Sequence, residues 1–105
     1  MNEQIQNELK FFAYCANYEP LFPPCDEQEQ WILQMAEYEE LNIVGVYKDE
    51  KSKTTEFEKL LKNISKGKAN GIIVWDMSMI PKTQMVEYLI QKNKIHVIKP
   101  FITSD

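Results

Sequence analysis

The sequence predicts an α/β fold in which one mainly parallel sheet carries helices on both faces. Short apolar runs rich in β-branched and aromatic residues alternate along the chain with segments whose apolar residues recur at helical spacing. The connections between these segments are short, and a regular alternation of strand and helix is typical of parallel sheets. We therefore expect a three-layer, flavodoxin-like doubly wound domain with four strands in the order β-α-β-α-β-α-β.

Length, composition and charge narrow the classes of protein further. The chain has 105 residues, 44% of them hydrophobic and 27% charged, which suits a polar extension over residues 1–8 and a single domain over residues 9–105. A net charge of −4 argues against a sequence-independent grip on DNA or on an anionic membrane. No apolar run approaches the roughly 18 residues of a membrane span, and the polar N-terminus is unlike a signal peptide, so we expect a cytoplasmic protein.

The first half of the chain is predicted to form a strand, a helix and a second strand. Residues 9–15 have the aromatic content of a buried strand, and three prolines follow them. A helix is expected over about 27–40, with Asp26 and Glu29 forming a capping box. Its apolar stripe consists of Trp31, Ile32, Met35, Ala36 and Leu41. The β-branched and aromatic residues at 43–47 predict the next strand.

The second half repeats this alternation. A helix is expected to begin near Thr55, with Glu58 three residues on, and its buried side should hold Phe57, Leu60, Leu61 and Ile64. Gly67 can end it, and residues 72–75 form a strand that is apolar on both faces. A third helix is expected to bury Met85, Val86, Leu89 and Ile90, before a last strand at 95–98.

Few residues suggest metal or redox chemistry. Cys15 and Cys25 lack further cysteine or histidine partners at metal-ligand spacing, and we expect both to be free thiols. His96 is the single histidine and stands in a strand pattern without nearby ligands, so a structural role is favoured for it. We expect no metal site and no cofactor.

A framework of residues spread over roughly 9–101 carries a family resemblance. It consists of Tyr14, Gln28, Val44-Gly-Val-Tyr47 with Asp49, Phe57 with Leu60-Leu61, Gly67-Lys68 and Ile72-Ile-Val-Trp75. This framework resembles the catalytic domain of the serine recombinases, the resolvase and invertase family, and it implies a resolvase-like fold. The resemblance also implies a relation to DNA site-specific recombination.

The catalytic residues of that family do not carry over. In the family a serine hydroxyl attacks a DNA phosphodiester, and several arginines stabilise charge on the phosphoryl group. Reading across the framework, the eight matching positions, called here the vestigial positions, are Ala16, Tyr18, Gln28, Asp49, Thr54, Ser78, Met79 and Lys82. Ala16, Thr54, Met79 and Lys82 stand for arginines, Tyr18 for the nucleophilic serine and Ser78 for an aspartate. We therefore expect a degenerate member, a pseudoenzyme without catalytic residues.

The resemblance also bears on which partners the chain is expected to bind. Family members continue into a long dimerising helix and a DNA-reading domain, whereas this sequence ends at Asp105, so we do not expect autonomous DNA binding. Our first hypothesis is an interaction or regulatory module of a mobile element or prophage, whose protein partner is a recombinase or a second copy. The loop residues Met77, Met79, Ile80 and Pro81 are apolar and expected to be exposed, which makes them a candidate partner surface.

Two other hypotheses stay open at this point. One is a small-molecule, phosphate or Mg²⁺-binding α/β domain, receiver-like, that uses Asp49, Asp76 and Ser78 in the pocket where strand order reverses. The other is a decayed fragment whose one remaining property is folding.

Overall fold

The computed structural model describes residues 9–17, 22–50, 53–92 and 95–97. Its strands are β1 (Lys10–Asn17), β2 (Asn42–Glu50), β3 (Gly71–Val74) and β4 (Ile95–Val97), and its helices are α2 (Cys25–Tyr38), α3 (Thr55–Ser65) and α4 (Gln84–Gln91), with a 3₁₀ turn η1 (Met77–Met79) ahead of α4. The predicted α/β fold with a parallel sheet covered by helices is confirmed. The predicted extension at 1–8 lies outside the described residues.

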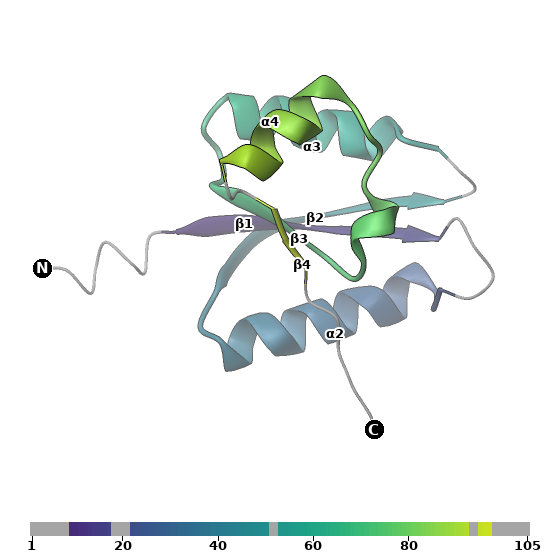
Figure 1. The fold of residues 1–105 in the computed structure, drawn as a ribbon. Helices are drawn as coiled ribbons and strands as arrows, with labels where there is room; N and C mark the ends of the chain where they lie inside the picture. The colour runs from purple at the N-terminus through teal and green to yellow at the C-terminus, as the bar shows by residue number, and fades with distance from the viewer. Residues whose placement is uncertain (1–8, 18–21, 51–52, 93–94, 98–105) are drawn as a thin grey trace, which may run out of the picture.

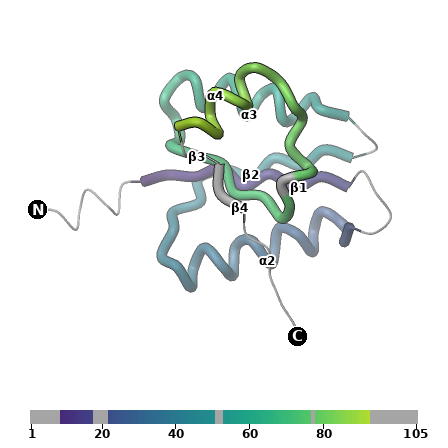
Figure 2. The backbone as a smooth tube through the Cα atoms, viewed as in Figure 1, coloured from purple at the N-terminus to yellow at the C-terminus, as the bar shows by residue number. Residues whose placement is uncertain are grey.

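The sheet has the strand order β2-β1-β3-β4, and every pairing in it is parallel. The chain therefore runs from β1 to the edge strand β2 and then crosses to β3 on the other side of β1 (Figures 1 and 2). Strand order reverses between β1 and β3, and in open parallel sheets ligands bind beyond the carboxyl ends of the strands at this place. The topology therefore predicts a binding site at the carboxyl ends of the strands, called here the carboxyl edge of the sheet.

The helices divide between the two faces, with α2 below the sheet and α3 and α4 above it in Figure 1. Central strand β1 is buried on both faces because its side chains alternate. Phe12, Tyr14 and Ala16 belong to the core under α3 and α4, whereas Phe11, Ala13 and Cys15 belong to the core over α2. This double burial explains why the sequence of β1 is a continuous apolar run.

A β-bulge shapes the pairing of β1 with β2. Phe11 pairs with Ile43 and Phe12 with Gly45, so Val44 is an extra residue and is 43% exposed. Beyond the bulge the ladder continues to Glu50, well past the predicted strand at 43–47. The Phe12 ring lies over Gly45 and meets the Tyr47 ring edge-on, with centroids 5.1 Å apart.

The predicted start of the first helix is wrong. The helix begins at Cys25 with Pro24 as its N-cap and no side-chain cap, and Asp26 pairs instead with Lys48 at 2.9 Å. The second helix begins at Thr55 as predicted, with Thr54 as its N-cap residue and again without a side-chain cap bond from that residue. A lysine at the end of a distant strand competes for the Asp26 carboxylate, which sequence spacing does not reveal.

The apolar faces of two helices are also narrower than predicted. Trp31 on α2 is 45% exposed, and Met85 and Ile90 on α4 are each 42% exposed. Val86 and Leu89 are the two α4 residues that reach the core. Among the described residues, no helix combines the length and the apolar character that a membrane span requires.

Substituting Gly45 with Ala should destabilise the protein by about 1 kcal/mol, because overpacking costs about 1–3 kcal/mol and the reduced freedom of the unfolded chain returns about 0.4–1 kcal/mol. The added Cβ would lie 3.1 Å from Cδ1 of Phe12, whose ring is held against Tyr47. Urea unfolding measures the change. Adding Phe12→Leu should shrink the cost of Gly45→Ala, and a Gly45→Ala variant as stable as the parent would contradict this view of the contact.

Candidate functional site

The candidate site lies at the carboxyl edge of the sheet, where strands β1, β2 and β3 end (Figure 1). The described vestigial positions all belong to segments at this edge. Ala16 is the second-last residue of β1 and Asp49 the second-last of β2, Gln28 lies in the first turn of α2, Thr54 is the N-cap residue of α3, Ser78 and Met79 lie in η1, and Lys82 precedes α4. Tyr18, the position matched to the nucleophile, lies outside the described residues.

Asp49 is a buried carboxylate, 3% exposed, that accepts three hydrogen bonds. Its Oδ2 accepts from the Tyr14 hydroxyl at 2.9 Å and from the Phe57 amide at 2.9 Å, and its Oδ1 accepts from the Glu56 amide at 3.0 Å. The two amides are free donors in the first turn of α3, where negative charge is favoured. Asp49 therefore caps α3 from the end of β2.

Gln28 locks the end of β1 to α2. Its Oε1 accepts from the Ala16 amide at 3.2 Å, and its Nε2 donates to the carbonyls of Ala16 at 2.7 Å and Pro23 at 2.8 Å. The side chain is fully buried, and these bonds use both ends of its amide. Gln28 is therefore a structural clamp on the strand and on the proline loop that leads into α2.

The proposed partner surface at 77–81 is wrong for the residues that can be tested. Met79 is fully buried and Ile80 is 5% exposed, and both pack in the core with β1, β3, α3 and α4. Pro81 is half-buried, and the side chain of Met77 is outside the described part of the structure. The turn η1 folds these apolar residues inward, which an apolar loop pattern does not distinguish from exposure.

Ser78, Lys82 and Thr54 stay at the surface of this edge. Ser78 is exposed, and its amide donates to Oδ1 of Asp76 at 2.9 Å, which orders η1. Lys82 is exposed, and the half-buried Thr54 donates through its hydroxyl to Glu58 at 3.3 Å. The printed bonds of Ser78 and Thr54 are thus local to η1 and to the start of α3.

The alternative site built on Asp49, Asp76 and Ser78 is not assembled. Asp49 is directed to Tyr14 and the amides of α3, while Asp76 bonds the backbone of η1. An open cavity of about 520 Å³ adjoins Asp49 at this edge, lined otherwise by Lys48, Glu50, Lys53, Thr55 and Glu56, so neither Asp76 nor Ser78 contributes to it. Within the described residues no group of three His, Cys, Asp or Glu side chains could hold a metal ion.

Two structural features of the edge escaped prediction. Lys48 pairs with Glu29 at 2.6 Å and Asp26 at 2.9 Å, which joins the end of β2 to α2. The hydrogen bonds to Glu29 and Asp26 raise the pKa of Lys48 above its ordinary value. The Tyr14 hydroxyl in an otherwise apolar strand was the available sign of a buried acceptor, since buried hydroxyls need partners.

Both cysteines are free and buried in the core between the sheet and α2, in agreement with the predicted free thiols. Burial raises the pKa of Cys15 to about 12, and the nearby Cys25 and Glu29 add to the shift. Burial also raises the pKa of Cys25, whose thiol donates to the Asp49 carbonyl at 3.6 Å. Protonated, enclosed thiols are poor nucleophiles and poor metal ligands.

Comparison with known proteins places the fold. No family model and no curated protein matches the chain. The structure is similar to the C-terminal catalytic domain of ISC1926 TnpA, an IS607-like serine recombinase, with a TM-score of 0.69 and 14% identity over 87% of this chain and 69% of that one. A resolvase family site-specific recombinase from Streptococcus pneumoniae is similar with a TM-score of 0.68 and 17% sequence identity, over 88% of this chain and 72% of that one. The N-terminal catalytic domain of TP901-1 integrase is similar with a TM-score of 0.67 and 19% sequence identity, over 86% of this chain and 75% of that one.

These similarities confirm, at the level of fold, the resemblance carried by the sequence framework. The chain has the α/β fold of serine recombinase catalytic domains. At such identities the similarity concerns architecture, and the chemistry has to be argued from the residues at the edge.

Replacing Asp49 with Ala should cost about 2–4 kcal/mol of stability, because three hydrogen bonds to a buried charged acceptor are lost and two α3 amides lose their cap. Thermal or urea unfolding measures this. Asp49→Asn keeps one acceptor oxygen and should cost less, and Tyr14→Phe, which removes a single one of these bonds, should cost least. Faster hydrogen exchange at Glu56 and Phe57 should accompany the loss, and an Asp49→Ala variant of parental stability would refute the capping role.

Iodoacetamide at about pH 8 should label neither cysteine of the folded protein, because the raised pKa values keep both thiols protonated well above neutral pH. Both should be labelled at once in concentrated urea. Mass spectrometry counts the adducts. Rapid labelling of Cys15 without denaturant would show that its side chain is not enclosed under α2, and the lack of labelling in urea would indicate a disulfide.

Proposed function

We propose that this chain keeps the fold of a serine recombinase catalytic domain without its strand-cleavage chemistry, and that it acts as an interaction or regulatory module of a mobile element or prophage. Its partner is a protein, either a recombinase or a second copy of the chain. The similar structures are those of recombinases and of an integrase, and this context supports the proposal.

One observation carries the proposal: four of the vestigial positions, Ala16, Gln28, Asp49 and Met79, are buried within the fold. Met79, matched to an arginine, is fully buried in the core, and Ala16, matched to another, is also fully buried. Gln28 and Asp49 resemble site-organising residues of the family. Gln28 forms hydrogen bonds with the backbone, and Asp49 accepts hydrogen bonds from the backbone and from the Tyr14 hydroxyl. A phosphodiester approaching these positions would find neither a nucleophile nor an arginine at them.

The magnitude of the missing interactions supports the same conclusion. Loss of a single preorganised stabiliser of transition-state charge commonly costs about 2.7–4 kcal/mol. Several are replaced here together with the serine matched to Tyr18. Residues that act as a unit are not additive, so the total is below the simple sum, but the loss of the nucleophile alone removes the covalent step.

The packing favours a maintained domain over a decayed fragment. Two buried clusters line the two faces of the sheet, and every buried side-chain nitrogen or oxygen in the described structure has a hydrogen-bond partner. A chain released from selection accumulates unpaired buried polar groups and cavities, each of which costs stability. The intact core supports a chain retained for an interaction.

The inactivity is tested by incubating the purified chain with supercoiled plasmids that carry serine recombinase sites, followed by denaturing gels that reveal covalent protein–DNA adducts. We expect no adduct and no relaxed or recombined plasmid, while a full-length serine recombinase serves as the positive control. Any adduct formed by the chain would overturn the claim that it lacks the cleavage reaction.

The regulatory role needs a separate measurement. Adding the chain in excess to the recombinase reaction should change the yield of recombined plasmid if the recombinase is its partner. If it is not, light scattering should reveal self-association. A monomer that leaves the recombinase unaffected would refute this choice of partner. Genes beside the coding sequence provide an inexpensive check, because a recombinase or a phage operon there is expected on this proposal.

A further inference from the structure

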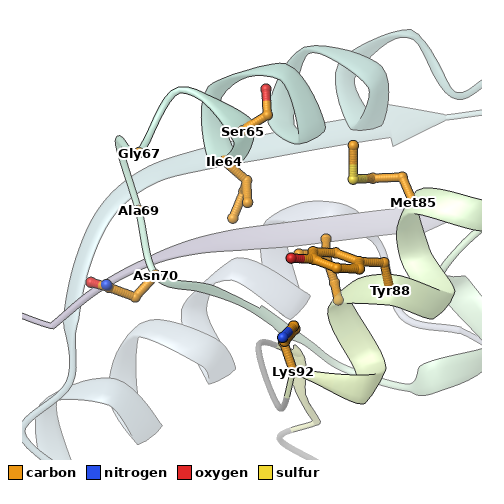
Figure 3. Close-up of a pocket in the computed structure, with 9 residues that line it drawn as sticks. Ile64, Ser65, Gly67, Ala69, Asn70, Met85, Tyr88 and Lys92 are labelled. Carbon is orange, nitrogen blue, oxygen red and sulfur yellow. The ribbon is translucent and has the colours of Figure 1, made fainter.

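A second concave surface lies at the amino edge of the sheet, away from the vestigial positions. It is a groove of about 630 Å³ between α3 and α4, bordered by the turn that leads from α3 into β3 (Figure 3). Its volume falls within the range of about 300–1,000 Å³ that is usual for binding pockets. We call it the lysine-rimmed groove.

The walls of the groove are mainly apolar. Ile64 from α3, Ala69 from the turn and Leu89 from α4 line it, together with Met85 and Tyr88. Figure 3 shows Met85 and Tyr88 reaching from α4 towards the α3 side, and these two side chains are 42% and 55% exposed. Exposed aromatic and thioether side chains beside a concavity are typical of interaction sites.

Among the described residues, the charged residue that lines the groove is a lysine, and the exposed Glu87 precedes the lining residue Tyr88. Lys92 lines it, with its Nζ 5.6 Å from the centre of the Tyr88 ring, and the exposed Lys66 and Lys68 flank the lining residue Gly67 in the turn. No Asp or Glu in the part of the chain that the structure describes lines the groove. This positive rim stands out on a chain with a net charge of −4, so it marks a local preference for negative charge.

We propose that the lysine-rimmed groove docks a short, acidic, amphipathic peptide segment of a partner protein, with apolar side chains against Ile64, Tyr88 and Leu89 and carboxylates beside Lys92. The proposal rests on the interaction-module function and names the chemistry of the partner. An apolar floor with a cationic rim suits a peptide that alternates apolar anchors with Asp or Glu.

A second copy of the chain fits this groove less well. A two-fold contact through the groove would bring Lys92 of one copy close to the lysine rim of the other, and like charges at an interface are unfavourable. Nucleic acid is also disfavoured, since it requires a row of cations along its backbone, whereas most of this lining is apolar.

The experiment begins with a phage-displayed library of random twelve-residue peptides selected on the immobilised full chain. We expect the enriched peptides to carry net negative charge together with Leu, Ile, Phe or Trp. Amide NMR titration with the most enriched peptide should shift the signals of Gly67, Asn70 and Tyr88 and leave those of Asp49 and Ser78 in place. Enrichment of basic peptides, of none, or shifts confined to the carboxyl edge would overturn the proposal.

Matched variants separate the groove from general surface effects. Tyr88→Glu and Lys92→Glu should each weaken binding by at least about tenfold, as expected for aromatic and charged anchors. Ile90 is an exposed apolar residue of α4 outside the groove lining, and Lys82 precedes α4, so Ile90→Glu and the charge reversal Lys82→Glu should bind within about twofold of the parent.

The outcomes are distinguishable from those for the proposed function. Equal weakening by the groove variants and their controls would reduce the effect to net charge and overturn the groove. Self-association that Tyr88→Glu abolishes would assign the groove to a second copy, which also overturns the peptide proposal. Because DNA cleavage is measured separately at the opposite edge, failure of peptide binding leaves the inactivity claim standing, and a covalent DNA adduct leaves the groove standing.

Discussion

The buried carboxylate of Asp49 is the interaction on which the arrangement of this domain depends. It joins three elements at one point, since it lies in β2, accepts from Tyr14 of β1 and accepts from two amides at the start of α3. A charge taken out of water is costly unless hydrogen bonds and favourable dipoles replace the solvent, and here a helix N-terminus and a hydroxyl do so. These directional bonds leave little freedom in where α3 starts.

The consequences of that anchor extend through the core on the α3 side. With α3 fixed at its first turn, the Phe57 ring packs on the Tyr14 ring at a centroid distance of 4.9 Å, and Leu60 one turn on is fully buried. On the opposite face, Gln28 of α2 forms hydrogen bonds with the backbone of Ala16 and so connects the end of β1 to α2. The carboxyl edge is thus held by polar bonds at its centre and apolar packing around it.

Much of the architecture was predictable because it depends on local patterns. Strand 71–74, helix 55–65 and the parallel arrangement follow from apolar periodicity and short connections. The helix caps were not predictable from local patterns. The carboxylate that caps α3 is Asp49 and the partner of Asp26 is Lys48, and both lie near the end of β2, outside the helices that they contact. The burial of Met79 and the exposure of Trp31 depend on how far each segment reaches over the sheet, which sequence spacing leaves undetermined.

The sequence predicted which positions gather at the carboxyl edge of the sheet. It did not predict which hydrogen bonds and packing contacts their side chains make. A helix N-terminus facing the carboxyl edge of a parallel sheet is a natural place for phosphate, since its free amides and dipole favour an anion. In this chain the start of α3 is already occupied by an internal anion, Asp49, and its first turn also carries Glu56 and Glu58. The first turn of α2 likewise carries Asp26 and Glu27. The free amides that open α3 are therefore used by the fold itself, because Asp49 accepts hydrogen bonds from two of them.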